Sequence, residues 1–351
     1  MNTSLKTLII RFSSIGDIIL ASPLLRVLRT KFPQGQIDFV TRKEYAELVR
    51  NNHNLNLTYE FDASTGFDGL RALKKRIKQE RYDLVIDIHD SLRSKYLRSI
   101  LGTKHIAVIN KRIIERSMLV KFRKNIYKDQ VPVADRYIEP VRKFGVENDG
   151  KGLELPIPDD VLFRVSGKIA SLRLDRFEKT IGLCPGARHG TKRWPRERFA
   201  ELAIRFVREF DGKVLMFGGG EDKDICSFLA DSVQEGAGKE RSTDFGGGLS
   251  LLETAAAMEY CDVIVTNDTG LMHMATAMRK RVVAVFGSTV REFGFFPYAS
   301  GATVIEQAGL DCRPCSHIGL PGCPEGHFRC MMDSTVEQVY EGMLQQLHRS
   351  D

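Results

Sequence analysis

The sequence lacks any run of about 18 consecutive apolar residues, the length that a helix needs to span a bilayer. We also expect no signal peptide, because Arg11 and Asp17 interrupt the N-terminal apolar stretch and no cleavage site follows. Both observations predict a cytoplasmic protein. At roughly 150 residues per domain, 351 residues predict two domains. With 42% apolar and 28% charged residues, the chain can form two sizeable cores.

Standard nucleotide-binding motifs are also missing. Neither GxxxxGK followed by Ser or Thr nor GxGxxG occurs, so the sequence supports neither a nucleoside triphosphatase nor a dehydrogenase. No clear Asp-x-Asp pair for a metal-bound nucleotide sugar is present, although "DIHD" at 87–90 approximates one. The sequence therefore gives no support for a metal ion at the active site.

Cysteines are few and unevenly spread. Three of the seven lie among apolar residues and are expected to be reduced core residues: Cys184, Cys226 and Cys261. The other four follow a C-x2-C-x7-C-x6-C pattern: Cys312, Cys315, Cys323 and Cys330. Thiolates at this spacing could hold a structural zinc ion, but the strong zinc signature has two C-x2-C pairs and this segment has one. Reduced loop cysteines are the alternative, disulfides are disfavoured in a reducing compartment, and we assign no metal.

Positive charge is concentrated in one stretch. Residues 91–130 contain eleven Lys and Arg but only two acids, Glu115 and Asp129, a net charge of +9 where the whole chain carries +7. Such a stretch attracts an anionic partner, which could be nucleic acid, an anionic membrane surface or a phosphorylated substrate. A solvated surface is the simpler interpretation. Nucleic acid is disfavoured because few aromatic residues alternate with the basic ones.

The stretch "LIIRFSSIGDIIL", residues 8–20, predicts the first strand, turn and helix of the fold. Its apolar residues predict a strand that ends near Phe12 and a helix over Ile18–Leu28, with Asp17 in the first turn. Residues 180–210 repeat the order strand, glycine-containing turn, helix. In open α/β sheets ligands bind at the carboxyl ends of strands, which is where Asp17 lies.

Further strands alternate with helices through both halves, which predicts an α/β fold of two Rossmann-like domains, with parallel sheets facing a central cleft. We expect an N-terminal domain over 1–165, a C-terminal domain over 166–333 and a closing helix within 334–351. The predicted strands are Ile37–Thr41, Leu84–Ile88, His105–Val108, Lys213–Phe217, Val263–Thr266 and Val282–Phe286.

Three motifs of the second half are candidate binding loops. In "PGARHGTKRWP", 185–195, Gly186 allows close backbone approach and Lys192 offers a cation for a diphosphate; a solvated loop is the alternative. In "MFGGGEDKD", 216–224, Asp222 or Glu221 could bind ribose hydroxyls or merely favour a helix N-terminus. In "VIVTNDTGLMHMATA", 263–277, an apolar strand ends in an Asp-Thr-Gly that could bind a sugar or cap a helix.

Taken in order, "SSIGD", "PGARHGTKRWP", "NDTGLMHMATA" and "VVAVFGST" resemble glycosyltransferase family 9, the heptosyltransferases of the bacterial lipopolysaccharide inner core. The resemblance covers nearly the whole chain and is weakest over residues 111–179. It implies a GT-B fold and inverting transfer of heptose from ADP-heptose to a lipid-borne acceptor. It also implies a general base, Asp17, and donor-binding residues at Gly186, Lys192, Asp222, Asp268, Thr269, Gly270 and His273.

On the acceptor side, the resemblance suggests Ser14 and Gly16 of the Asp17 turn, together with Arg93. Lipid A phosphates and acidic core sugars would explain the basic stretch and a peripheral contact with the cytoplasmic face of the inner membrane. General-base assistance of this kind contributes about 10²–10⁴-fold. The rivals are another GT-B enzyme with a different donor sugar, an epimerase, and, suggested by charge alone, a nucleic-acid-binding protein.

Overall fold

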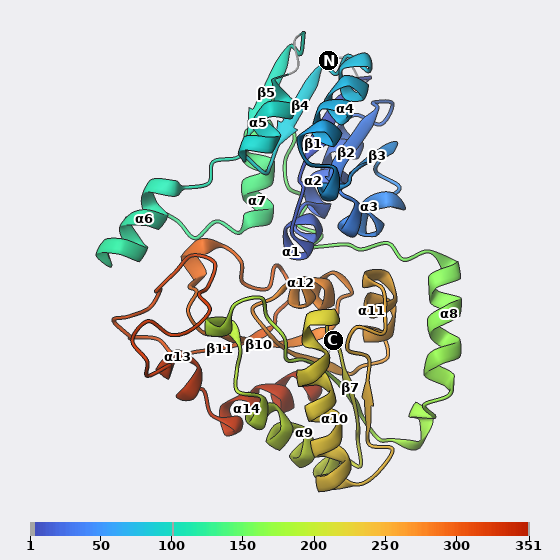
Figure 1. Cartoon of the computed structure of the whole chain (residues 1–351), viewed down its shortest axis with the longest axis vertical. Coiled ribbons are helices and arrows are strands. Elements are labelled where there is room, and N and C mark those ends of the chain that lie inside the picture. The colour runs from blue at the N-terminus through green and yellow to red at the C-terminus, as the bar shows by residue number, and fades with distance from the viewer. Residues whose placement is uncertain (1–3, 100–101, 350–351) are drawn as a thin grey trace. The chain divides into compact units, whose positions relative to one another are not determined.

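The structure is a computed structural model that describes residues 4–99 and 102–349. The chain forms two compact units. The first unit contains Met1–Arg112 and Val131–Pro156, and the second contains Ile113–Gln130 and Ile157–Asp351. Each unit is built on its own parallel sheet, which confirms the predicted α/β class (Figure 1). The boundary expected after residue 165 falls inside a helix of the second unit.

The sheet of the first unit has five parallel strands in the order β3-β2-β1-β4-β5. Its central strands are buried on both faces, as their nearly unbroken apolar sequences require. The four strands predicted here, which correspond to β1, β2, β4 and β5, are confirmed, and β3 was not anticipated. The bounds are β1 (Thr7–Ile10), β2 (Ile37–Arg42), β3 (Leu57–Phe61), β4 (Leu84–Asp87) and β5 (His105–Val108).

Helices follow each strand of this unit. The single helix predicted over Ile18–Leu28 is wrong, because two helices, α1 (Ile15–Ile19) and α2 (Ser22–Lys31), take its place. Pro23 has no N–H to donate to the carbonyl of Ile19, so it can begin a helix but cannot continue one. The remaining helices are α3 (Glu47–Arg50), α4 (Gly66–Gln79), α5 (Leu92–Arg98) and α7 (Val133–Ile138).

The sheet of the second unit has six parallel strands in the order β11-β10-β9-β6-β7-β8. The strands predicted in this half are confirmed. Because β6 lies between β9 and β7, the loops that follow these three strands meet at one edge of the sheet. The bounds are β6 (Thr180–Cys184), β7 (Lys213–Met216), β8 (Ser242–Asp244), β9 (Val263–Asn267), β10 (Arg281–Phe286) and β11 (Thr303–Glu306).

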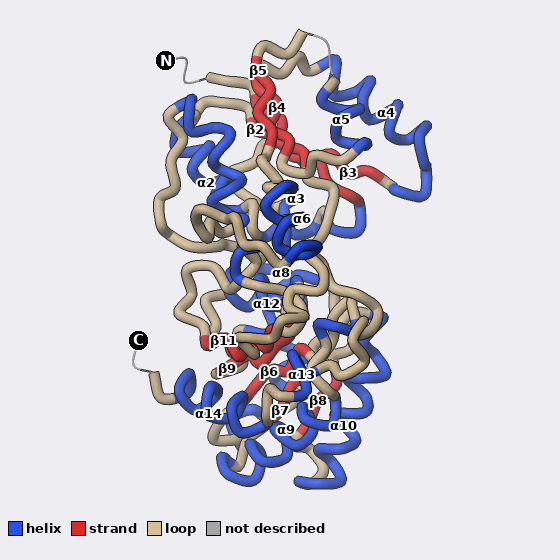
Figure 2. The backbone as a smooth tube through the Cα atoms, turned by 90° about the vertical axis from the view of Figure 1, so that its left-hand side faces the viewer, coloured by secondary structure: helices blue, strands red, loops and turns tan. Residues whose placement is uncertain are grey.

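Helices cover both faces of this sheet. Figure 2 shows α9, α10 and α14 on one side of the strands and α12 on the other. The predicted C-terminal helix is α14, and its Tyr340 and Met343 are part of the core of the second unit. The bounds are α6 (Ile113–Phe122), α8 (Asp159–Ala170), α9 (Arg196–Phe210), α10 (Lys223–Ala237), α11 (Leu251–Met258), α12 (Gly270–Ala277), α13 (Arg329–Met332) and α14 (Val336–Leu347).

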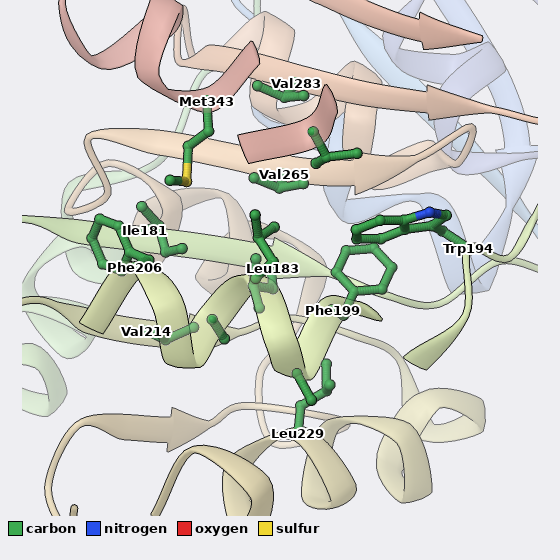
Figure 3. Close-up of a cluster of buried hydrophobic side chains, with 14 of the residues drawn as sticks. Ile181, Leu183, Trp194, Phe199, Phe206, Val214, Leu229, Val265, Val283 and Met343 are labelled. Atoms are coloured by element: carbon green, nitrogen blue, oxygen red, sulfur yellow. The ribbon is translucent and has the colours of Figure 1, made fainter. Parts of the chain in front are cut away.

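The core of the second unit fixes the end of the 185–195 loop. Trp194 is fully buried, and its ring packs edge-on against Phe199 of α9 with 4.9 Å between ring centroids (Figure 3). The indole Nε1 donates a hydrogen bond of 2.8 Å to the carbonyl oxygen of Ser334. Burying a side chain of this size contributes about 2–3 kcal/mol, so the loop cannot leave the sheet without losing core packing.

The basic stretch is divided between the units. Residues 113–130, with α6, group with the second unit, where Arg123 donates to the carbonyl oxygen of Pro314 and Asn125 to the carboxylate of Glu292. Residues 113–130, expected within the N-terminal domain over 1–165, therefore group with the second unit instead. Among the described residues, no helix combines the length and the apolar character needed to cross a membrane.

Candidate active site

Asp17 lies in the first turn of α1, directly after the carboxyl end of β1, as predicted. Its Oδ1 is 2.6 Å from the Nη2 of Arg11 and accepts a hydrogen bond of 3.1 Å from the hydroxyl of Tyr137. Its Oδ2 accepts from the backbone N–H of Ser14 at 3.2 Å and from the Ser14 hydroxyl at 2.9 Å. Gly16, in the same turn, is buried. Both oxygens of the carboxylate are therefore fully engaged.

The surroundings of Asp17 keep it ionised. Burial would raise its pKa, but the charge of Arg11 and the hydrogen bonds from Ser14 outweigh burial and hold the pKa below its ordinary value. Arg11 is itself fixed by hydrogen bonds to the carbonyl oxygens of Ser13 and Ile88. The result is a carboxylate that is charged at neutral pH and fixed in orientation.

The "DIHD" sequence does not form a metal site. Asp87 is fully buried and accepts hydrogen bonds from the backbone N–H groups of His89 and Asp90, and it pairs with Arg98 at 2.9 Å. Burial, together with the charges of Arg11 and Lys111, lowers the pKa of His89 to about 3. His89 is thus a neutral imidazole at physiological pH, and it is a site neighbour that sequence reasoning missed.

Arg93 lies in the first turn of α5, and its side chain is exposed. Several other basic residues of the 91–130 stretch pair with acids outside that stretch. Arg98 pairs with Asp87 and Asp90, Lys104 with Asp83, and Arg112 with Glu139. The field of this region is therefore weaker than its sequence charge of +9 suggests.

In the second unit, the strand order brings together residues that are distant in the sequence. The Nζ of Lys192 is 2.7 Å from the Oδ2 of Asp268, and that oxygen also accepts a hydrogen bond of 2.6 Å from the hydroxyl of Thr289. Asp268 and Thr289 are both buried. Lys192 follows β6, Asp268 follows β9 and Thr289 follows β10. The sequence motifs gave no role to Thr289.

Asn267 is a second residue that sequence reasoning missed. It is fully buried at the end of β9, where its Oδ1 accepts from the backbone N–H of Trp194 at 3.0 Å. Its Nδ2 donates to the carbonyl oxygen of Pro185 at 2.7 Å. One side chain thus ties the two ends of the 185–195 loop to the neighbouring strand. A buried Asn at a strand end is the signal that could have revealed it.

Gly186 and Asp222 are also brought together. A Cβ atom at Gly186 would lie 2.2 Å from the carboxylate of Asp222, so a larger residue at this position would have to displace that carboxylate. Burial raises the pKa of Asp222 above its ordinary value, although a hydrogen bond from the N–H of Gly219 opposes the shift. Both residues border the loop that carries Lys192.

The Asp-Thr-Gly residues that follow β9 have mixed roles. The hydroxyl of Thr269 accepts a hydrogen bond of 3.0 Å from the N–H of Leu271, so it caps α12, and Gly270 begins that helix. His273 is buried within α12. Asp268 thus contacts the ammonium of Lys192, whereas Thr269 caps the adjacent helix.

The seven cysteines all carry free thiols, and Cys184, Cys226 and Cys261 are buried as expected. Burial, reinforced by the neighbouring Cys315 and Cys323, raises the pKa of Cys330 to about 11. Within residues 4–99 and 102–349, no group of three or more His, Cys, Asp or Glu side chains is arranged to hold one metal ion.

Comparison with known proteins agrees with this geometry. Residues 70–322 match Glycosyltransferase family 9 (heptosyltransferase). The chain is 26% identical to lipooligosaccharide heptosyltransferase 2 of Campylobacter jejuni over 93% of each chain. Its fold is similar to the crystal structure of a glycosyl transferase family 9 protein from Veillonella parvula (TM-score 0.82, 24% identity, 100% and 99% of the chains covered).

A second solved structure, E. coli ADP-heptose lps heptosyltransferase II, has the same fold (TM-score 0.74, 23% identity, 98% of each chain covered). These similarities confirm the two Rossmann-like domains of a GT-B protein. The family match spans most of the sequence and includes the loop of Lys192 and the residues that follow β9. The chain therefore belongs to glycosyltransferase family 9.

Proposed function

We propose that this protein transfers heptose from ADP-heptose to the inner core of a lipopolysaccharide or lipooligosaccharide, with inversion at the anomeric carbon. The observation that carries the proposal is the Lys192 ammonium, held by Asp268 at the carboxyl ends of neighbouring strands in a chain of family 9. An oriented cation at that position suits a departing diphosphate. The names of relatives favour an acceptor that already carries one heptose.

In this proposal the second unit binds the donor. Lys192 contacts the diphosphate and stabilises the charge that develops as ADP leaves. Gly186 lets the phosphates approach the backbone, and Asp222 contacts the ribose. Asp268, Thr269 and the nearby Gly270 and His273 form the remaining donor side.

The first unit binds the acceptor and supplies the base. The acceptor hydroxyl loses its proton to Asp17 as its oxygen attacks the anomeric carbon, and the bond from that carbon to the diphosphate breaks. Four N–H and O–H groups already contact the carboxylate of Asp17. The hydroxyl of the acceptor sugar must therefore replace one of these contacts. The exposed Ser14 hydroxyl can rotate away most easily, so Ser14 marks the side of Asp17 from which the acceptor binds. Arg93 is the proposed contact for an acceptor phosphate or carboxylate.

The decisive experiment measures ADP release from ADP-heptose with deacylated inner-core acceptors that carry no heptose or one heptose. Asp17→Asn keeps the shape of the side chain but cannot take the proton, so turnover should fall by about 10²–10⁴-fold while ADP binding persists. Ser14→Ala keeps the base and removes one hydrogen bond, so turnover should stay within about tenfold of wild type. Full turnover by Asp17→Asn would refute the base. ADP release without an acceptor would instead indicate hydrolysis of the donor.

We also propose that residues 113–130 contact the anionic membrane surface that carries the acceptor. Ile114 and Phe122 of α6 are 72% and 68% exposed, and the exposed Lys121 and Lys124 lie close to Phe122 in the sequence. Apolar side chains beside lysines suit the boundary of an anionic bilayer. Phe122→Asp should reduce co-sedimentation with phosphatidylglycerol vesicles while turnover of a deacylated acceptor stays unchanged. Equal sedimentation of variant and wild type would refute this contact.

A further inference from the structure

The segment between β11 and α13 contains three of the four clustered cysteines, Cys312, Cys315 and Cys323, but neither a helix nor a strand. We define residues 310–328 as the cysteine segment; Cys330 follows it in α13. A long irregular segment in a compact unit usually has a role of its own. The contacts of the cysteine segment lead to the loop that carries Lys192, and they do so by two separate routes.

The first route is through the backbone. The N–H of Thr191 donates to the carbonyl oxygen of Leu320 at 3.1 Å, and the N–H of Leu320 donates to the Thr191 hydroxyl at 2.8 Å. That hydroxyl also lies 3.0 Å from the hydroxyl of Ser288. Thr191 is 1% exposed, so these bonds form in a dry environment where they orient the backbone strongly. They fix the residue directly before Lys192.

Two glycines make this approach close. A Cβ atom at Gly190 would lie 2.0 Å from the carbonyl oxygen of Pro321. A Cβ atom at Gly319 would lie 2.6 Å from the Cβ of His189, and Gly319 has a φ of +106°, which side chains rarely allow. The loop of Lys192 and the cysteine segment are thus in contact along three consecutive residues, His189 to Thr191.

The second route is through side chains. The side chain of Arg313 is 6% exposed, and its Nε and Nη2 donate to the carbonyl oxygen of Thr289 at 3.1 and 2.6 Å. The hydroxyl of Thr289 donates to Asp268, and Asp268 pairs with Lys192. Arg313 also pairs with Glu306, at the end of β11. A continuous series of hydrogen bonds therefore connects the cysteine segment to the Lys192 ammonium.

We propose that the cysteine segment is a positioning element for the donor diphosphate. Arg313 and Thr289 are positioning residues that act through Asp268, while Leu320 acts through Thr191. Neither Arg313 nor Thr289 needs to touch the donor. Without this support, Asp268 loses the hydrogen bond from Thr289 that fixes its orientation. The ammonium of Lys192 then samples positions that do not suit a diphosphate. This inference rests on the proposed binding of ADP-heptose by the second unit. It assigns roles to Thr191 and Thr289, which lie in the motifs but had none, and it adds Arg313 and Leu320 from outside them.

The first test compares ADP affinity by calorimetry, and donor and acceptor kinetics, in wild type and Thr289→Val. This variant keeps the shape of the side chain and removes the hydroxyl. We expect ADP affinity and kcat/KM for the donor to fall about tenfold, since the lost hydrogen bond reaches a carboxylate. KM for the acceptor should stay unchanged, and Thr289→Ser should restore donor binding.

Thr276→Val is the matched control, because Thr276 is equally buried and its hydroxyl bonds to the carbonyl oxygen of Met272 in its own helix. An equal loss in Thr276→Val and Thr289→Val would overturn the proposal, as would wild-type ADP affinity in Thr289→Val. Failure of Thr289→Ser to restore binding would also overturn it.

The second test does not depend on the identity of the donor. Amide hydrogen exchange at Thr191 should be faster in Arg313→Met than in wild type, because the route through Arg313 anchors the segment that protects this amide. Arg313→Lys should lie between the two. Unchanged exchange at Thr191 in Arg313→Met would overturn the proposal. If wild type neither binds ADP nor turns over ADP-heptose, the proposed function fails, whereas the exchange experiment still decides the positioning role.

Discussion

The two units carry charged pairs of similar chemistry but different construction. Arg11 and Asp17 pair within one strand, turn and helix, only six residues apart in the sequence. Lys192 and Asp268 pair across two strands, and their contact exists because β6 lies next to β9 in the sheet. The first pair is made by local chain geometry and the second by topology.

This difference determines what each site depends on. The groups that bind the Asp17 carboxylate belong to residues nearby in the sequence, apart from the hydroxyl of Tyr137 in α7. The Lys192 loop is connected through Asn267, Thr289 and the cysteine segment to several strands. We therefore expect substitutions far from Lys192 in the sequence to affect donor binding, whereas Asp17 should respond mainly to its own turn and to Tyr137.

Among the tests of the Lys192–Asp268 pair, Lys192→Met should have the largest effect. This change removes the cation and keeps the length of the side chain, so kcat should fall by about 10²–10³-fold if the ammonium stabilises the leaving diphosphate. Steady-state kinetics with ADP-heptose measure it. Lys239→Met, at an exposed position of the same unit, is the control that should leave kcat unchanged. A normal kcat in Lys192→Met would mean that the pair with Asp268 is only structural.

Asn267→Ala tests whether one buried side chain holds the whole 185–195 loop. The variant leaves the N–H of Trp194 and the carbonyl of Pro185 without their partner, so the free energy of unfolding should fall by about 2–4 kcal/mol. Urea unfolding measures this, and KM for the donor should rise in parallel. Asn125→Ala, at an exposed residue, should change stability by less than about 0.5 kcal/mol. A stability loss as small as that of the control would show that the loop is held by other contacts.

The same contrast explains which parts of the molecule the sequence could predict. Apolar runs separated by polar turns predicted most strands and the position of Asp17, since these features depend on neighbouring residues. The break between α1 and α2 was missed although Pro23 signals it, because the apolar pattern continues past the proline. The strands β3, β8 and β11 were missed because their sequences are partly polar.

Contacts between distant residues could not be predicted in this way. Motifs marked Lys192 and Asp268 separately, but only the strand order brings them into contact. Asn267 and Thr289 stand beside residues that were recognised, yet their partners lie on other loops. The charge of the 91–130 stretch was overestimated for the same reason, because Asp83, Asp87 and Glu139 lie outside it and pair with its basic residues.

Arg11→Met tests whether the local pair sets the pKa of Asp17. Arg11 opposes the effect of burial on Asp17, so its removal should raise the pKa of Asp17. The acidic limb of the kcat/KM profile should then move to higher pH by about one unit.

Stability should respond to pH in the same variant. A carboxylate with a lowered folded-state pKa adds stability above its unfolded value of about 4 and loses it as pH falls through the folded value. Wild type keeps this contribution at neutral pH, and Arg11→Met should not. An acidic limb that does not move, measured from about pH 3 to pH 7, would show that Asp17 is not the group that titrates.

The smallest expected effect concerns Thr269. Its hydroxyl either only caps α12 or also contacts the nucleotide-sugar donor. Thr269 caps α12 through the N–H of Leu271, so Thr269→Ala should lower the free energy of unfolding by about 1 kcal/mol. Thr269→Ser keeps the hydroxyl and should restore stability. If the hydroxyl only caps the helix, ADP affinity will follow stability in both variants. If it also contacts the donor, Thr269→Ala will lose more ADP affinity than its stability explains. One side chain would then both cap its own helix and contribute to a donor site that the strand order assembles. The contrast between a site made by local chain geometry and a site made by strand order would then be one of degree.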